Sequence, residues 1–185
     1  MLFRSDLTGS AAEGQAVAAR LGAHGWAPVT HLSTADATRA AVLEGLASAD
    51  LFHFAGHGRF AGAAGWDSAL LLADGGQLDA ADLLALRRAP PFVVLSGCET
   101  ARTVAGAEAP GLDIGLAQAF VLAGAHVALA AARTVSDADT RALFERFYDA
   151  WQPGEPPGPA FGAAVSALRA ARPTADAGAF RLFVP

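Results

Sequence analysis

The chain has 185 residues, of which 53% are hydrophobic and 17% charged, and its formal net charge is −5. This length and composition suit one globular domain, so we expect a single domain over residues 1–185. All 13 cationic residues are arginines scattered along the chain without a basic stripe, and we therefore expect no nucleic-acid partner.

Helix-like and strand-like segments alternate through the first half of the chain. Leu2 and Phe3 are short for a first strand, as they would be if the chain began inside an element. The pattern Ser10-Ala-Ala-Glu13 is typical of a capping box that opens a helix. The segments expected next are a helix from Ser10 to Leu21, a strand over Trp26–Leu32, a helix over Asp36–Ala47, a strand over Leu51–Ala55, a hairpin at Trp66–Asp74 closed by Asp74-Gly75-Gly76, a helix from Asp79 to about Arg88 and a strand over Phe92–Ser96.

The second half begins with a loop of small residues, Cys98–Pro110, which we expect to be exposed and mobile. Helices then follow over Leu112–Ala123, from Ser136 or Asp137 to Trp151, and over Ala160–Arg172, with strands over Ala125–Ala131 and Phe180–Val184 and a surface loop at Gln152–Pro159.

The longest apolar stretch, Ala117–Ala132, contains Gln118 and His126 and is too short to span a membrane. No basic segment precedes a short apolar one near the start of the chain. We therefore expect a cytoplasmic protein of bacterial type without membrane contact.

This alternating order predicts an α/β fold, with a mostly parallel β-sheet and helices on both faces. The strands Leu51–Ala55 and Phe92–Ser96 are joined through a helix, and such a crossover commonly places the two strands side by side. His57 and Cys98 then follow the carboxyl ends of neighbouring strands, where open α/β sheets bind their ligands.

Cys98 is the single cysteine of the chain, so it has no disulfide partner and no second thiolate for a zinc site. A histidine near a thiol favours the thiolate, which is the nucleophilic form of cysteine. Glycines at positions 56, 58 and 97 allow sharp turns beside both residues. The pair thus indicates a histidine base and a cysteine nucleophile, whereas the structural alternative is a buried cysteine that acts as a small hydrophobic residue.

The segments His53-Phe-Ala-Gly-His57-Gly and Leu95-Ser-Gly-Cys98-Glu-Thr resemble the paired signatures of CHAT domains, caspase-like cysteine peptidases of bacteria related to caspases, separases and gingipains. The resemblance continues through Gly115–Ala125, Val135–Thr140 and Phe147-Tyr148 and so covers nearly the whole chain. It implies a three-layer caspase-like fold, with His57 as the base, Cys98 as the nucleophile, and the main-chain N–H groups of Gly58 and Cys98 as the oxyanion hole. The implied activity is that of an endopeptidase that cleaves peptide bonds in a protein or peptide substrate.

Two features depart from that family. Many members carry a tryptophan before the Val-x-Asp segment, where this chain has Arg133-Thr134, so the substrate pocket is expected to differ. Helical repeats often accompany the domain and are missing here. The resemblance therefore implies that any activating or regulatory protein of helical-repeat type acts from another chain or from another part of the gene product.

Four residues are candidates for the substrate pocket: His53, Ser96, Arg133 and Asp137. His53 stands inside a strand, which favours a packed or hydrogen-bonded histidine over a pocket residue, although it could orient His57. Asp137 follows a strand end, but a position in the first turn of a helix explains it as well. The spacing of the other histidines indicates no metal site, and we expect no cofactor.

Two other functions are compatible with parts of the pattern. A catalytically inactive caspase-like scaffold would use the same groove to bind a partner. A nucleotide-binding module is disfavoured because no G-x-G-x-x-G or G-x-x-x-x-G-K-[ST] loop follows a strand.

Overall fold

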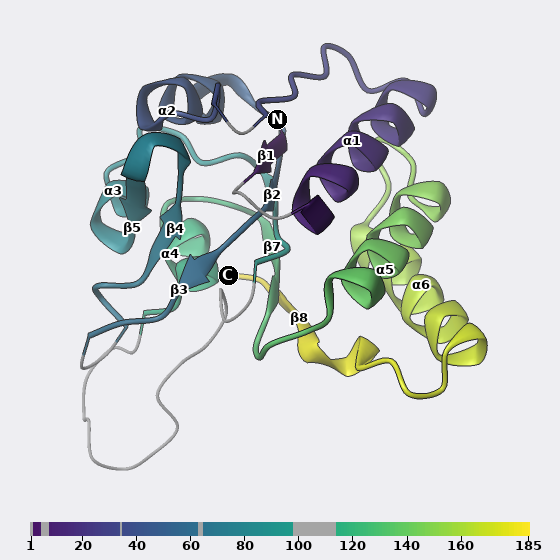
Figure 1. The fold of residues 1–185 in the computed structure, drawn as a ribbon. Coiled ribbons are helices and arrows are strands. Elements are labelled where there is room, and N and C mark those ends of the chain that lie inside the picture. Colours follow the sequence, from purple (N-terminus) through teal and green to yellow (C-terminus); the bar gives the residue numbers. More distant parts are fainter. Residues whose placement is uncertain (1, 5–7, 34, 63–64, 98–113) are drawn as a thin grey trace.

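The computed structural model describes residues 2–4, 8–33, 35–62, 65–97 and 114–185, which form a central sheet between two layers of helices (Figure 1). One face of the sheet is covered by α1 (Thr8–Ala23), α5 (Asp137–Ala150) and α6 (Pro157–Ala171). On the other face lie α2 (Arg39–Ser48), α3 (Ala80–Leu84) and α4 (Leu116–Leu122).

The main sheet has the strand order β1-β2-β6-β7-β8, where β1 is Leu2–Arg4, β2 Leu51–Ala55, β6 Phe92–Leu95, β7 Val127–Ala131 and β8 Phe180–Phe183. The first four strands are parallel, and β8 pairs antiparallel with β7 at one edge. The predicted α/β fold with a mostly parallel sheet is confirmed. The predicted adjacency of the strands that precede His57 and Cys98 is confirmed as well.

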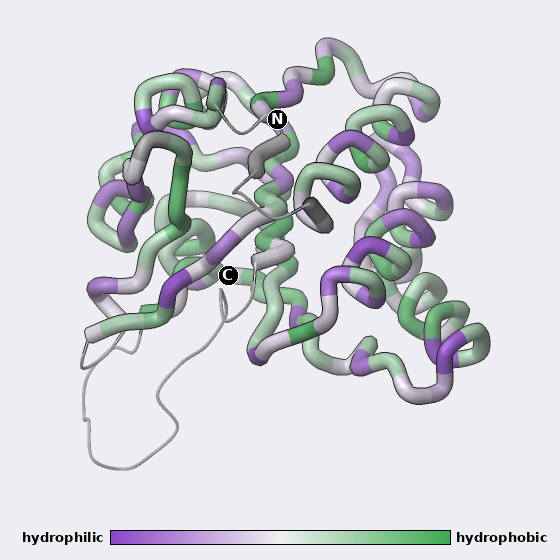
Figure 2. Tube along the Cα trace, in the orientation of Figure 1, coloured by the Kyte–Doolittle hydropathy of each residue, from purple (hydrophilic) through white to green (hydrophobic). Residues whose placement is uncertain are grey.

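Alternation along the strands divides the hydrophobic core between the two faces of the sheet. On β2, Phe52 and Phe54 pack toward α2, α3 and α4, whereas Leu51 packs toward α1, α5 and α6. Val93 and Val94 of β6 divide in the same way. Because both faces are covered, β2 and β6 are buried throughout and apolar except at one position, His53 (Figure 2).

A second, smaller sheet follows directly after β2. It consists of β3 (Gly58–Arg59), β4 (Ala69–Leu71) and β5 (Gln77–Asp79), all antiparallel. A hairpin with Asp74-Gly75-Gly76 at its turn was predicted, and β4 and β5 form one through a short 3-10 helix at Ala73–Gly75. Asp79 caps α3 as predicted, with its carboxylate accepting from the N–H of Asp82 at 2.9 Å.

The strand predicted at Trp26–Leu32 is wrong, because only His31 makes a bridge there. Trp26 and Val29 pack against the core beneath α1 and α5 instead of joining a ladder, and Pro28 has no N–H to donate to one. The helices α3 and α4 are also shorter than expected. The predicted loop at Cys98–Pro110 lies outside the described residues.

The capping box predicted at Ser10–Glu13 is wrong as well. Helix α1 already includes Thr8, so Ser10 lies inside the helix and not at its cap. The Glu13 carboxylate is nearly fully buried and bonds to His53 at 2.9 Å, not to the start of its own helix.

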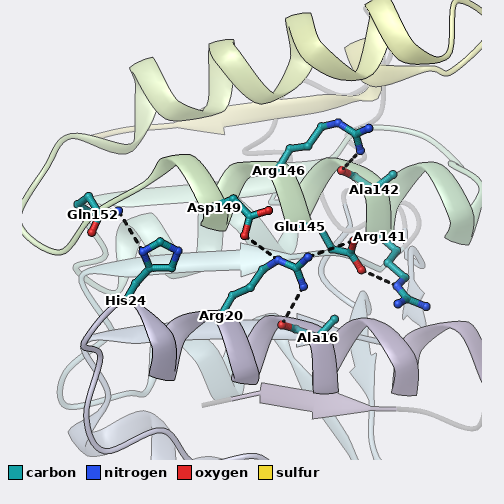
Figure 3. A network of polar contacts seen from close by, with 9 residues as sticks. All are labelled: Ala16, Arg20, His24, Arg141, Ala142, Glu145, Arg146, Asp149 and Gln152. Atoms are coloured by element: carbon teal, nitrogen blue, oxygen red, sulfur yellow. Dashed lines mark hydrogen bonds and ion pairs between the residues drawn. The ribbon is translucent and has the colours of Figure 1, made fainter.

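Polar contacts join α1 to α5 along their outer surface (Figure 3). The guanidinium of Arg20 bonds to Asp149 at 2.8 Å and lies 3.4 Å from Glu145, and it also donates to the carbonyl of Ala16. Just after the end of α1, Nδ1 of His24 lies 3.0 Å from Nε2 of Gln152. These pairs lie at the surface or partly buried, and such ion pairs contribute little to the free energy of unfolding. No helix in the described part of the chain is both long and apolar enough to cross a membrane.

Gly65 allows a close approach that a side chain would prevent. Its φ is +78°, and a Cβ built on it would lie 2.7 Å from the carbonyl oxygen of Ile114, just before α4. Gly75 has nearly the same φ, +77°, and open space around it. We expect Gly75→Ala to lower the free energy of unfolding by about 1 kcal/mol, and Gly65→Ala by roughly 1–3 kcal/mol more. Urea denaturation measures both, and equal losses would contradict the contact with Ile114.

Candidate functional site

The backbone on both sides of His57 is held by sheet pairing. His57 follows β2 by two residues and precedes β3 directly, and its carbonyl accepts from the N–H of Leu71 in β4 at 3.0 Å. The preceding Gly56 is buried, whereas the imidazole of His57 is exposed. The chain thus presents an accessible histidine side chain on an anchored backbone at the carboxyl edge of the main sheet.

The neighbouring strand leads to the predicted nucleophile. Phe54 of β2 pairs with Leu95 of β6, and the N–H of Ser96 extends the ladder by donating to the carbonyl of Phe54 at 2.8 Å. Gly97, the last described residue before Cys98, is buried. Cys98 itself lies outside the described residues. In the sequence, His57 and Cys98 each follow the Phe54–Leu95 pair by three positions.

The main-chain N–H of Gly58 is directed away from β4. Gly58 stands opposite Leu70, and the bond from Leu71 to the His57 carbonyl flanks this pair. That pattern belongs to a non-hydrogen-bonded pair of an antiparallel ladder, in which the two facing residues direct their own N–H groups away from each other. The N–H of Gly58 is therefore not used in the pairing with β4.

Ser96 adds an unpaired hydroxyl at this edge. Its Oγ is buried and has no hydrogen-bond partner among the described residues. Ser96 is two residues beyond Val94, so it continues the face of β6 that packs toward α1 and α5. Of the four pocket candidates, it is the one next to Gly97 along the chain.

His53 lies in the core and not in an open pocket. Its side chain is 0% exposed, its Nε2 is 2.9 Å from the Glu13 carboxylate of α1, and its Nδ1 is 3.0 Å from the Tyr148 hydroxyl of α5. The ring also contacts Phe144 edge-on, with the two centroids 5.2 Å apart. Substrate cannot reach this ring, so the structure does not support His53 as a pocket residue. It shows His53 as the packed, hydrogen-bonded histidine that was the alternative.

The bonds of this buried group assign its protons. The Glu13 carboxylate only accepts, so Nε2 of His53 donates to it. Burial first, and then the negative charge of Glu13, raise the pKa of Tyr148 well above its ordinary value, so its hydroxyl keeps its proton and donates to Nδ1. Both ring nitrogens of His53 thus have a hydrogen-bond partner.

Glu13 and Tyr148 were not predicted from the sequence as partners of His53. A signal for Glu13 exists in the spacing, since it stands four and eight residues before Val17 and Leu21, both of which are buried on α1. A carboxylate in such an apolar stripe needs a buried partner. His53 is the one polar residue in the apolar run of β2 and is therefore the natural candidate.

Arg133 follows β7 by two residues at the same edge of the sheet as His57. Its guanidinium forms two bonds of 2.6 Å with the carboxylate of Asp176, which lies shortly before β8. The hydrogen bonds from Arg133 lower the pKa of Asp176 below its ordinary value. Both side chains are about half exposed, so Arg133 is accessible to a ligand along this edge.

Asp137 opens α5 next to the first turn of α1. A Cβ built on Gly9 of α1 would lie 2.5 Å from Oδ2 of Asp137, so the carboxylate rests against that glycine. Negative charge is favourable at the amino end of a helix. The structure thus gives Asp137 the helix-terminal position that was the alternative to a pocket role.

Among the residues that the structure describes, no three His, Cys, Asp or Glu side chains are grouped so that they could hold a metal ion. The described part of the site is therefore an exposed imidazole, a main-chain N–H of Gly58 that is not used in the pairing with β4, and a neighbouring strand, β6, that ends at Leu95, two residues before Gly97. These are the parts that acyl transfer to a cysteine requires beside the thiol itself.

Comparison with known proteins agrees with this architecture. A family model described as CHAT domain matches residues 1–177. No curated protein matches the chain. The matched range includes both strands of the site, the small sheet after His57 and all of the helices α1 to α6. With its caspase-like α/β sheet and this match over nearly its whole length, the chain belongs to the CHAT-domain family.

Proposed function

We propose that the chain is a cysteine endopeptidase of caspase-like type, with His57 as the base and Cys98 as the nucleophile. One observation carries this proposal: His57 and Gly97, the residue before Cys98, leave the carboxyl ends of two adjacent parallel strands. Neighbouring strands are roughly 4.8 Å apart. Side chains that follow the ends of such strands can reach each other directly or through small movements on substrate binding.

The proposed reaction begins with transfer of the Cys98 thiol proton to the imidazole of His57. The thiolate attacks the scissile carbonyl carbon, and the oxygen of the tetrahedral intermediate accepts hydrogen bonds from the N–H groups of Gly58 and Cys98. The C–N bond then breaks as the imidazolium returns its proton to the leaving amine. Water hydrolyses the thioester and regenerates the thiol.

The orientation of Gly58 supports this role. A main-chain donor that already serves in a ladder could not stabilise an oxyanion without losing its first bond. The N–H of Gly58 is directed away from β4 because of the flanking bond between Leu71 and His57. The same ladder holds the donor rigidly, which spares reorganisation when charge develops.

We propose a protein or peptide as the substrate. A regulatory protein of helical-repeat type, in the same gene product or in another chain, is proposed as the partner that controls access. The exposed imidazole of His57 supports a site that is reached from solvent.

A peptide library tests the proposed activity. We expect the native chain to cleave a subset of peptides and Cys98→Ala to cleave none, because the variant lacks the nucleophile. Iodoacetamide is expected to label Cys98 faster than a model thiol at pH 7, since His57 would favour the thiolate. Labelling no faster than the model thiol, together with an absence of cleavage, would contradict the proposal and favour the alternative of an inactive scaffold that binds a partner.

A further inference from the structure

Three arginine side chains converge on one short segment at the carboxyl edge of the sheet. A Cβ built on Gly178 would lie 3.2 Å from Nη2 of Arg169 and 4.0 Å from Nη2 of Arg133. Arg181 donates through Nη1 to the carbonyls of Gly178 and Phe180. We call Arg133, Arg169 and Arg181 the arginine cluster.

Among the residues that the structure describes, the cluster interacts with the carboxylate of Asp176. The hydrogen bonds from Arg133 and the charges of all three arginines lower the pKa of Asp176. All three arginines are exposed, and among the described residues they outnumber the carboxylate that they share. This is a local excess of positive charge on a chain whose net charge is −5.

Stability alone does not explain three arginines at this place. Exposed ion pairs contribute little to stability, and one arginine already pairs with Asp176 through two bonds. Arg133 uses its Nε and Nη2 for that pair, so its Nη1 is directed away from Asp176. Nη2 of Arg169 and Nη2 of Arg133 both lie near the position of a Cβ on Gly178, at 3.2 Å and 4.0 Å.

The cluster lies along the edge that carries the proposed reaction site. Ala132 donates to the carbonyl of Ala179 at 2.9 Å, which places the Gly178 segment beside the end of β7. Strand β7 is in turn the neighbour of β6, the strand that ends before Gly97. Two strand spacings amount to about 10 Å, and an extended peptide covers this distance in roughly three residues.

We propose that the arginine cluster is a subsite for an acidic side chain of the substrate, about three to five residues from the bond that is cleaved. The inference rests on the proposed peptidase function and specifies its substrate class as peptides with Asp or Glu at that distance. Arginine suits this role because its planar guanidinium binds carboxylates through paired hydrogen bonds. Arg169 and the Nη1 group of Arg133 supply the donors, while Asp176 keeps Arg133 oriented.

Matched peptides that carry Glu, Gln or Lys at one position, varied along the substrate, test the subsite. We expect a Glu preference in kcat/KM of about threefold to tenfold at one of these positions for the native chain, weaker at high salt. Arg169→Gln should remove most of this preference, and Arg169→Glu should reverse it toward Lys. The control Arg39→Gln removes an exposed arginine at the start of α2 that is paired with Asp82 of α3. This variant should keep the Glu preference of the native chain.

Binding to Cys98→Ala, followed by fluorescence anisotropy, separates this inference from the proposed activity. Suppose that the native chain cleaves no peptide, that Glu peptides nevertheless bind Cys98→Ala better than Gln peptides do, and that adding Arg169→Gln abolishes this difference. The subsite then stands and the peptidase proposal fails. Cleavage without any Glu preference would overturn the subsite alone. So would equal competition by a single-stranded oligonucleotide, because the cluster would then be a general surface for polyanions.

Discussion

Replacing His57 by alanine is expected to lower kcat/KM for a cleaved peptide by about 10²–10⁴-fold, the usual contribution of a positioned acid–base group. The imidazole is exposed on a backbone anchored by the bond from Leu71, so the substitution removes the base without disturbing the core. A continuous assay with a fluorogenic peptide measures the loss. Alkylation of Cys98 in the same variant should slow in parallel, because the thiolate loses the group that favours it.

Tyr148→Phe is the matched control for the His57 substitution. It disturbs the bonds of His53, the other histidine of the same signature, without touching the proposed base. We expect kcat/KM to change less than about threefold, since His53 is fully buried and does not meet substrate. A larger loss in Tyr148→Phe than in His57→Ala would mean that the buried histidine, and not His57, governs the chemistry.

The position of the proposed base could be predicted because it depends on topology. Two apolar strands joined through a helix become parallel neighbours by general rules of chain connection, and Phe54 indeed pairs with Leu95. Gly56 and Gly58, on either side of His57, indicated a sharp turn after β2. Apart from the family resemblance, no sequence pattern indicates the orientation of the Gly58 N–H, because it depends on the pairing of a two-residue strand, β3, with β4.

Local patterns misled where tertiary contacts decided the outcome. Ser10 and Glu13 have the spacing of a capping box, yet the bond of Glu13 to His53 is made across the core. Trp26–Leu32 has a strand-like composition, but Trp26 and Val29 pack against the core on the α1 and α5 side without joining the sheet. Asp137 is a pocket candidate because it follows a strand end, and Arg133 because it stands where the family often has a tryptophan. The structural neighbours of these two residues, Gly9 and Asp176, are distant in sequence and could not be read from either pattern.

The buried contact of Glu13, His53 and Tyr148 is expected to be the most sensitive point for stability. Replacing His53 by leucine leaves the Glu13 carboxylate in the core without its donor, and we expect the free energy of unfolding to fall by about 3–5 kcal/mol. Tyr148→Phe leaves only Nδ1 of His53 unpaired and should cost about 1–2 kcal/mol. Urea denaturation at pH 7 measures both losses.

The double variant Glu13→Leu/His53→Leu shows whether the unpaired Glu13 carboxylate or poor packing of the new leucine causes the destabilisation. If the loss in His53→Leu comes from the stranded carboxylate, removing that carboxylate as well should recover part of the lost free energy, because apolar replacements of a buried pair are often tolerated. Glu13 and His53 come from α1 and β2, and Tyr148 from α5, so the same bonds hold two helices against the strand that leads to His57. A double variant less stable than His53→Leu would show that the leucines fit the core badly and that packing, not charge, dominates here.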